Sequence, residues 1–199
     1  MTTIEQRPTA SCDAARRAMI DSQLRTSGVN EPWVLAAMAS VPREDFVPAQ
    51  MRSSAYIDRA IPLDDGGFLA APIVHGRMLA EAAPTRDDKA LLVGDAKGYL
   101  AALLRPLVGS LDAIAPGQAT AKRKNAYSLI VVDGAAEEVP AALTGQLAEG
   151  GRLVGGQVLR GVTRLVVGRK VAGEVTLLPL AEIGIPVLPE FSAPKRWSF

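Results

Sequence analysis

The amino-acid sequence predicts an α/β fold in which a helical N-terminal region precedes a mostly parallel sheet. Before about residue 85, apolar residues recur mainly at helical spacing. After it, short β-branched runs alternate with helical patterns, and this alternation is typical of a parallel sheet with helices on its faces. The last three runs are separated only by short turns, which predicts that the sheet ends in antiparallel strands.

The region 1–84 is predicted to be mainly helical. In the first helix, Ser11 or Asp13 can cap the start, and Gly28 follows the last apolar position and can end it. Pro32 suits the first turn of the second helix, because a helix leaves the first backbone N–H groups without an internal partner. The expected helices span residues 12–27, 49–56 and 72–83, and the second one runs from Pro32 until Val41-Pro42 stops its pattern.

The region 85–199 is predicted to contain the sheet and to form one compact unit with the helical region. Its runs of β-branched and aliphatic residues are short and are bounded by glycine, proline and polar residues, as strands are. The expected strands span residues 89–93, 111–115, 127–132, 151–158, 163–170 and 174–180, with helices at 98–104 and 138–148.

Composition excludes several classes of function. The 22 Lys and Arg residues nearly balance the 21 Asp and Glu residues, so no large basic field is present to attract nucleic acid or an anionic membrane. No apolar stretch approaches the length of a membrane span. Cys12 is the only cysteine and the N-terminal residues do not resemble a secretory signal, so we expect a cytoplasmic protein. With His75 as the only histidine, we expect no metal site.

Two long blocks of the sequence carry a family resemblance. "MIDSQLRTSGVNEPWVLAAMASVPREDFVP", followed by "AYIDRAIPL", resembles the N-terminal signature of protein-L-isoaspartate O-methyltransferases. "IVVDGAAEEVPAALTGQLAEGGRLV" resembles a later strand-helix-strand segment of the same family. The resemblance implies a Rossmann-like, S-adenosylmethionine-dependent methyltransferase fold with a helical N-terminal extension. It also implies transfer of a methyl group to the α-carboxyl of an isoaspartyl residue in a damaged protein.

The resemblance places the cofactor loop at "LVGDAKGY", residues 92–99. The family pattern is E/D-x-G-x-G-x-G, and here Leu92 stands at the acidic position and Ala96 at the second glycine. An alanine at a position that needs a positive φ is expected to add about 1–2 kcal/mol of strain. We therefore interpret the segment as a strand-to-helix turn in preference to a working cofactor loop. Its candidate cofactor-binding residues are Gly94, Asp95, Ala96, Gly98 and Tyr99.

The second strand and the connector after it also depart from the family. Where the family has a carboxylate that binds the ribose hydroxyls of the cofactor, this chain has Ala115, and Asp112 is expected to be a solvated residue at the start of the strand. Between Gly117 and Tyr127, "QATAKRKNA" replaces a helix, a strand and the turn beside the adenine ring. We expect a shortened sheet edge without one wall of the adenine pocket, and we read Lys122-Arg123-Lys124 as a solvated turn.

The substrate side lacks the family's hydroxyl groups. The family reads G-Q-T-I-S-x-P where this chain reads "GGFLAAP", so Ala70 stands at the serine and Phe68 at the threonine. We therefore assign no catalytic residue, and interpret Phe68 and Leu69 as core or interface residues. Methyl transfer depends on orientation of the bound groups, so the missing hydroxyls should slow it severely.

Few other residues are candidates for chemistry. Asp133 sits at the carboxyl end of an expected central strand, where open α/β sheets place their ligands, so it is the best remaining polar candidate for a cofactor contact. An aspartate that forms a turn with Gly134 is an equally good interpretation. Glu137-Glu138 are expected to favour the N-terminal end of the following helix. Cys12 has no cation beside it except Arg16, so a catalytic thiol is not expected.

Two functional hypotheses follow. The first is a catalytically impaired relative of the isoaspartyl methyltransferases that binds a protein or peptide partner and needs no cofactor. The second is an active enzyme that uses S-adenosylmethionine in a rearranged site. We further expect self-association through the shortened sheet edge. We also expect an ordered C-terminal segment anchored by Phe191, Trp197 and Phe199.

Overall fold

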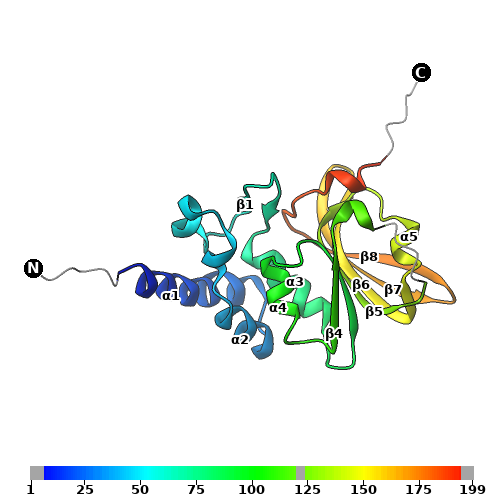
Figure 1. Ribbon diagram of the computed structural model, residues 1–199, viewed down its shortest axis with the longest axis horizontal. Coiled ribbons are helices and arrows are strands. Elements are labelled where there is room, and N and C mark those ends of the chain that lie inside the picture. The colour runs from blue at the N-terminus through cyan, green and yellow to red at the C-terminus, as the bar shows by residue number, and fades with distance from the viewer. Residues whose placement is uncertain (1–6, 120–123, 194–199) are drawn as a thin grey trace, which may run out of the picture. The chain divides into compact units, whose positions relative to one another are not determined.

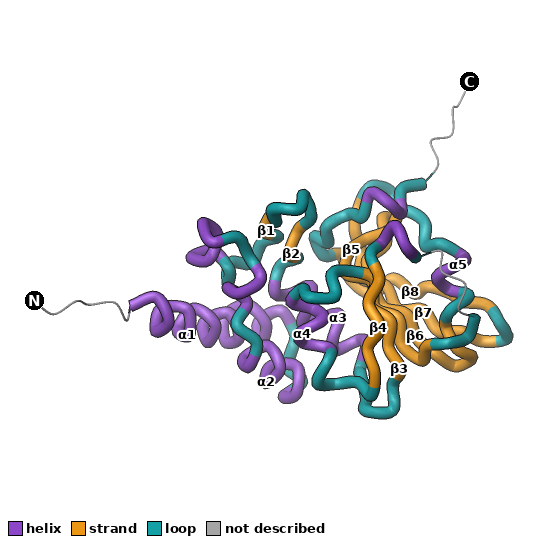
Figure 2. The backbone as a smooth tube through the Cα atoms, in the orientation of Figure 1, coloured by secondary structure: helices purple, strands orange, loops and turns teal. Residues whose placement is uncertain are grey.

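The computed structural model describes residues 7–119 and 124–193 (Figure 1). It divides into two compact units, Met1–Ala80 and Glu81–Phe199, and the boundary falls within a helix. Among the described residues, no helix is long and apolar enough to cross a membrane. Figure 2 shows the first unit as mainly helical and the second as dominated by strands.

The first unit begins with a longer helix than the sequence pattern predicts. Helix α1 (Arg7–Met19) passes into a π-helical turn and then a 3₁₀ turn, and Gly28 ends the run with a φ of +86°. Gly28 is therefore the expected stop, because a left-handed residue suits glycine. The expected start is wrong, since Ser11 and Asp13 lie inside α1 and do not cap it. The residues before Cys12 show no apolar periodicity, so the pattern could not indicate the extra turns.

Short elements follow, and the sequence predicts the helices among them but not the hairpin of β1 and β2. Helix α2 (Pro32–Ser40) has proline in its first turn, whereas the expected third helix is only a 3₁₀ turn over Ala49–Ser54. Strands β1 (Ile61–Pro62) and β2 (Phe68–Leu69) form a small antiparallel hairpin, and helix α3 (Pro72–Ala82) comes directly after it.

A glycine allows α3 to pack closely within the first unit. A Cβ added at Gly76 would lie 3.3 Å from side-chain atoms of Leu24 and Val29. Both of these side chains are fully buried, as is Met78 on the same helix. The expected helix at 72–83 is therefore confirmed, and its packing depends on a small residue at position 76.

The second unit contains a six-stranded sheet in the order β4-β3-β5-β6-β7-β8. The first four strands in this order pair in parallel, and β6, β7 and β8 pair antiparallel. This confirms a mostly parallel sheet that ends in antiparallel strands. The strands are β3 (Lys89–Val93), β4 (Ser110–Ile114), β5 (Tyr127–Ala136), β6 (Leu147–Leu159), β7 (Val162–Val171) and β8 (Glu174–Glu182).

The sheet edge is short, as the sequence predicts. Strand β4 is the last strand on its side, and the described residues between it and β5 contain only a 3₁₀ turn over Pro116–Gln118. Backbone hydrogen bonds join Asn125 to Gly145 and Ala126 to Gln146, so the end of the connector is held by the chain just before β6. Lys122 and Arg123 lie outside the described residues, and Lys124 is exposed as expected.

One predicted helix is mostly wrong. Helix α4 (Tyr99–Leu104) follows β3 as expected, but α5 spans only Ala141–Thr144 instead of 138–148. The reason is a tertiary contact, because the Gln146 carbonyl accepts the N–H groups of Ala126 and Tyr127. From Leu147 onward the chain pairs with β5, so strand pairing overrides the local helical pattern.

One face of the sheet packs on a core that includes the C-terminal segment. Figure 1 shows α4 and α5 on opposite sides of β4. Phe191 is 4% exposed and belongs to a cluster with residues of β3, β5 and β6. Val187 pairs in parallel with Ala135. The segment is ordered through Phe191 as predicted, whereas Trp197 and Phe199 lie outside the described residues. The fully buried members of this cluster on the strands and α5 include Val93, Ile130, Leu143 and Leu147.

Candidate functional site

The predicted cofactor loop lies at the carboxyl end of β3, between the ends of β4 and β5. Gly94 N–H donates to the carbonyl of Ile114 at 2.9 Å, which ties the loop to β4. A Cβ added at Gly94 would lie 3.0 Å from the Cβ of Asp133 on β5. The structure therefore brings Gly94 and Asp133 together, as the sequence predicts for a site at the carboxyl edge of a parallel sheet.

The loop itself is a turn that satisfies its own backbone groups. Asp95 accepts twice, from Lys97 N–H at its Oδ1 (2.9 Å) and from Gly98 N–H at its carbonyl (3.1 Å). Arg105 Nη2 donates to the Ala96 carbonyl at 3.0 Å. Donors that a cofactor loop would direct at a ligand are thus used within the turn.

The predicted strain at Ala96 is not present. The residues with positive φ do not include Ala96, nor do they include Gly94 or Gly98. The side chain of Asp95 caps a turn that needs no left-handed residue, so an alanine fits at position 96 without strain. The expectation of about 1–2 kcal/mol was based on the family pattern, which this turn does not follow.

Tyr99 is a core residue. Its side chain is 1% exposed at the start of α4, so it does not face solvent beside the loop. A Cβ added at Gly98 would lie 3.2 Å from the Asp95 carbonyl, so the tight turn explains this glycine. Of the loop residues, Asp95, Ala96 and Lys97 are exposed.

The end of β4 offers no carboxylate for a ribose. Ala115 follows the strand directly, and the nearest preceding acid in the chain, Asp112, lies three residues back, about 10 Å along a strand. Asp112 is not a solvated residue as expected. It is half-buried, and its Oδ2 accepts a hydrogen bond from the Tyr127 hydroxyl at 2.7 Å.

Asp133 lies within a strand and not in a turn. It is half-buried where the pairing of β5 with β6 shifts register between Val131 and Ala135. Gly134 is required because a Cβ there would lie 2.5–2.9 Å from side-chain atoms of Leu188. The alternative interpretation of Asp133 as a turn-forming residue is therefore wrong.

Glu137 anchors the C-terminal segment. Its Oε2 accepts the N–H of Ala193 at 2.7 Å, and the N–H groups of Glu137 and Glu138 both donate to the Phe191 carbonyl. Both glutamates were expected to favour the N-terminal end of the following helix. The contacts described for them are instead with the C-terminal segment, and α5 begins only at Ala141.

The substrate-side segment lies in the first unit. Ala70 is 2% exposed and its carbonyl accepts a hydrogen bond from Arg43 Nη2. Leu69 is buried, which confirms it as a core residue, whereas Phe68 is 54% exposed. The segment therefore presents an aromatic ring where the family presents a hydroxyl.

The remaining sequence candidates do not form a reactive site. Burial raises the pKa of the Cys12 thiol, and the nearby Glu44 carboxylate raises it further, so the thiolate is disfavoured. His75 is fully buried and contacts Arg43. Within residues 7–119 and 124–193, no group of three or more His, Cys, Asp or Glu side chains is arranged to hold a metal ion.

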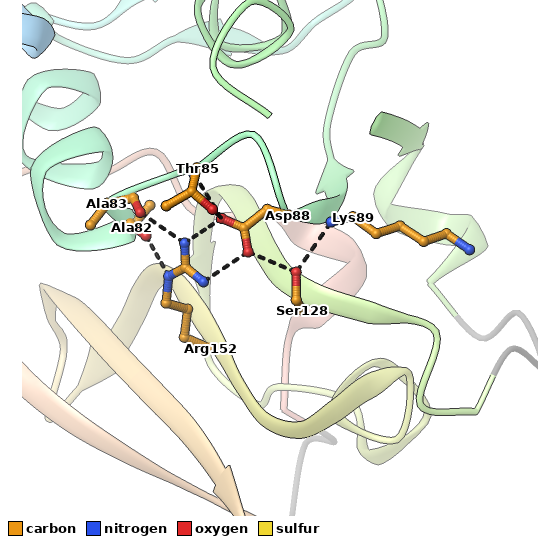
Figure 3. Close-up of polar contacts among 7 residues, drawn as sticks. All are labelled: Ala82, Ala83, Thr85, Asp88, Lys89, Ser128 and Arg152. Atoms are coloured by element: carbon orange, nitrogen blue, oxygen red, sulfur yellow. Dashed lines mark hydrogen bonds and ion pairs between the residues drawn. The ribbon is translucent and has the colours of Figure 1, made fainter. Parts of the chain in front are cut away.

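The sequence analysis missed a polar network on the far side of the sheet from the candidate cofactor loop, near the starts of β3 and β5 (Figure 3). Arg152 donates to both carboxylate oxygens of Asp88, at 3.0 and 2.7 Å, and to the carbonyls of Ala82 and Ala83 at the end of α3. Ser128 Oγ donates to the same carboxylate at 2.7 Å, and Thr85 N–H donates at 2.8 Å. An aspartate one residue before a buried strand was the only available signal.

This network holds the pKa of Asp88 well below its usual range. Burial alone would raise that pKa, but the hydrogen bonds from Arg152, Ser128 and Thr85 stabilise the charged form and outweigh it. The network joins Asp88, which directly precedes β3, to Ser128 near the start of β5 and to Arg152 on β6. It therefore lies away from the candidate cofactor loop, which follows the carboxyl end of β3, and it stabilises the fold.

A family model matches most of this chain. The model describes protein-L-isoaspartate(D-aspartate) O-methyltransferases, and it matches residues 14–116 and 112–178. The chain belongs to this family. The two matched segments meet at the end of β4, which is the position of the shortened sheet edge.

Relatives and solved structures agree with this assignment. A protein-L-isoaspartate O-methyltransferase of Methanoculleus marisnigri is 30% identical over 90% of this chain and 94% of its own length. One of Methylorubrum populi is 33% identical over 76% of this chain and 86% of its own. A Plasmodium falciparum structure described as a protein-L-isoaspartate O-methyltransferase, in complex with S-adenosyl-L-homocysteine, superposes with a TM-score of 0.71 at 17% identity. The superposition covers 90% of this chain and 98% of the Plasmodium falciparum chain, so the fold is the Rossmann-like fold of these methyltransferases.

The residues of this family member fit S-adenosylmethionine poorly. The loop after β3 uses its Lys97 and Gly98 N–H groups internally. No carboxylate follows β4 at Ala115, and no described strand lies beyond β4. Each of the three parts of the cofactor, the methionine, the ribose and the adenine, therefore lacks a contact expected from the family pattern.

Proposed function

We propose that this family member does not transfer methyl groups and acts instead as a protein that binds a protein or peptide partner. The end of β4 carries the proposal, because Ala115 offers no carboxylate to the ribose and β4 is the terminal strand among the described residues. A hydrogen bond to a charged group contributes about 1.5–3 kcal/mol and a neutral one about 0.5–1.5 kcal/mol. Three lost contacts would weaken micromolar binding to the millimolar range.

Calorimetry with S-adenosylmethionine and with S-adenosylhomocysteine tests the proposal. We expect dissociation constants above about 100 μM, equivalent to about −5.5 kcal/mol, and no methylation of an isoaspartyl peptide. Ala96→Gly should not restore binding, because the turn at Ala96 is unstrained. The Methylorubrum populi relative, measured in parallel, controls for the assay.

A dissociation constant below about 100 μM would contradict the proposal and favour the second function, an active carboxyl methyltransferase that repairs isoaspartyl residues. Two observations favour that alternative. Gly94 lies against Asp133 at the carboxyl edge of the sheet, and the curated relatives carry the name of the repair enzyme. A ligand present at 100 times its dissociation constant would add about 2.7 kcal/mol to stability, so a thermal shift would also reveal it.

The open edge at β4 supports self-association as part of the binding function. An unpaired strand edge is usually covered, charged or paired with another chain, and within the described part of the chain β4 pairs only with β3. We expect light scattering at high micromolar concentration to give twice the mass of the chain. A strictly monomeric protein under these conditions would contradict this prediction.

A further inference from the structure

Arg43 is a fully buried arginine that joins three segments of the first unit. It begins the 3₁₀ turn Arg43–Phe46 and is 0% exposed. Its Nε donates to the Ala55 carbonyl at 2.7 Å, and its Nη2 donates to the Ala70 carbonyl. Its Nη1 lies 3.3 Å from Nδ1 of His75 on α3. One planar guanidinium therefore sets the relative positions of three chain segments.

Two of these partners bracket the hairpin of β1 and β2. Ala55 precedes the hairpin, Ala70 follows β2 directly, and both are buried. Arg43 thus holds the entry and the exit of the hairpin to one rigid group. Its own N–H adds a contact to the hydroxyl of Tyr56, at 3.2 Å, on the entry side.

The contact with His75 determines the tautomer of this histidine. An arginine side chain has only donors, so Nη1 donates and Nδ1 of His75 accepts. An accepting Nδ1 corresponds to the tautomer whose proton is on Nε2. In an imidazolium, both ring nitrogens would be donors, and an N–H group would face the guanidinium.

The hairpin that Arg43 holds has a tight loop and an exposed ring. Leu63 N–H donates to the Gly67 carbonyl at 2.9 Å, and Gly66 N–H donates to the Leu63 carbonyl at 3.1 Å. Phe68 follows the loop and is 54% exposed. The same segment carries Ala70, so it contains both positions where the family resemblance places substrate-side hydroxyl groups.

We propose that Arg43 is a positioning residue which, with His75 held as the neutral Nε2–H tautomer, fixes the conformation of the hairpin at residues 61–69. The hairpin then presents Phe68 in one defined place. That this hairpin surface meets a protein partner rests on the proposed function. The positioning role of Arg43 and the tautomer of His75 do not rest on it.

Nitrogen-15 NMR of histidine-labelled protein tests the tautomer directly. His75 is the only histidine, so a single pair of ring nitrogen signals reports on it. At neutral pH we expect Nδ1 in the unprotonated range and Nε2 in the protonated range. A ring protonated on Nδ1, or on both nitrogens, would overturn the proposal. This readout does not involve a partner or a cofactor, so it is distinct from any failure of the proposed function.

Hydrogen exchange at the amides of Leu63 and Gly66 tests whether Arg43 holds the hairpin in place. Arg43→Lys keeps the charge but loses the planar fork, so we expect exchange at these amides to rise about tenfold, equivalent to about 1.4 kcal/mol. The matched control is Arg52→Lys, an exposed arginine of the same unit, which should leave these rates unchanged. A rise that is equal throughout the first unit would indicate general destabilisation and would overturn the positioning role.

Two substitutions of His75 decide the question if Arg43→Lys does not fold. His75→Asn retains an acceptor at the place of Nδ1, and His75→Gln moves the polar group toward the place of Nε2. We expect exchange at Leu63 and Gly66 to stay near the wild-type rate in the first variant and to rise in the second. The opposite order, or equal rates in the two variants, would show that the Nδ1 contact does not position the hairpin.

Discussion

Replacing Asp88 with asparagine is expected to lower the free energy of unfolding by about 3–5 kcal/mol, the usual cost of removing one partner of a buried ion pair. The carboxylate is 6% exposed and accepts hydrogen bonds from Arg152, Ser128 and Thr85. An asparagine would place an NH₂ group against the donors of Arg152 and leave that guanidinium without a counter-charge. For a chain of this length, a loss of 3 kcal/mol corresponds to a fall in Tm of about 6–12 °C.

Asp87→Asn is the matched control, because Asp87 is the exposed neighbour of Asp88 in the chain. Its effect on the free energy of unfolding should stay within about 0.5 kcal/mol. Chemical denaturation at pH 7 measures both variants. Equal effects of the two substitutions would show that the network in Figure 3 does not stabilise the fold.

The effect of Asp88→Asn should also depend on pH. The pKa of Asp88 is lower in the folded protein than the value of about 3.9 in an unfolded chain, so folding is favoured while the carboxylate is charged. Its contribution is complete at neutral pH and is lost as the pH falls below about 5. The difference in stability between wild type and variant should therefore shrink in acid. A difference that is constant down to pH 3 would contradict this assignment.

Replacing Phe191 with alanine is expected to cost about 3–5 kcal/mol, the usual loss for a buried aromatic side chain. The ring is 4% exposed and packs in the core cluster beneath the sheet. The backbone contacts of Phe191 with Glu137 and Glu138 survive the change, so the loss measures the ring itself. Thermal unfolding or chemical denaturation gives the value.

Phe68→Ala provides the control for Phe191→Ala, since both remove the same side chain. Phe68 is 54% exposed, and its truncation should change the free energy of unfolding by no more than about 0.5 kcal/mol. If Phe191→Ala is as mild as Phe68→Ala, the C-terminal segment does not dock in solution. If Phe191→Ala lowers the free energy of unfolding by the expected value of about 3–5 kcal/mol, the ring of Phe191 holds the C-terminal segment against the sheet.

Local patterns were enough to locate most of the strands and the family. The runs at 89–93, 127–132 and 163–170 became β3, β5 and β7, because short β-branched stretches between turn residues have few alternatives. The short connector before Tyr127 correctly predicted that β4 is the last of the described strands on its side of the sheet. Missing residues in a chain are visible in the sequence itself, so this feature needed no structure.

Two errors arose where a distant segment supplied the deciding contact, and a third arose where a neighbouring side chain did. The helix expected at 138–148 ends at Thr144 because the Gln146 carbonyl accepts N–H groups from the start of β5. Asp112 looked solvated, but Tyr127 donates to it from a strand two positions away in the sheet. At Ala96, the family pattern suggested a left-handed residue, and the side chain of Asp95 instead caps a turn without one.

The sequence by itself determined the order of the elements, the family, the loss of polar groups at Ala70 and Ala115 and the loss of a glycine at Ala96, since each depends on residue identity and local spacing. Only the tertiary structure decided which polar groups meet. Asp88 and Arg152 lie 64 residues apart in the chain, and Arg43 and His75 lie 32 apart. Burial makes an unpaired charge costly, so the fold brings such groups together across distances at which spacing in the sequence carries no signal.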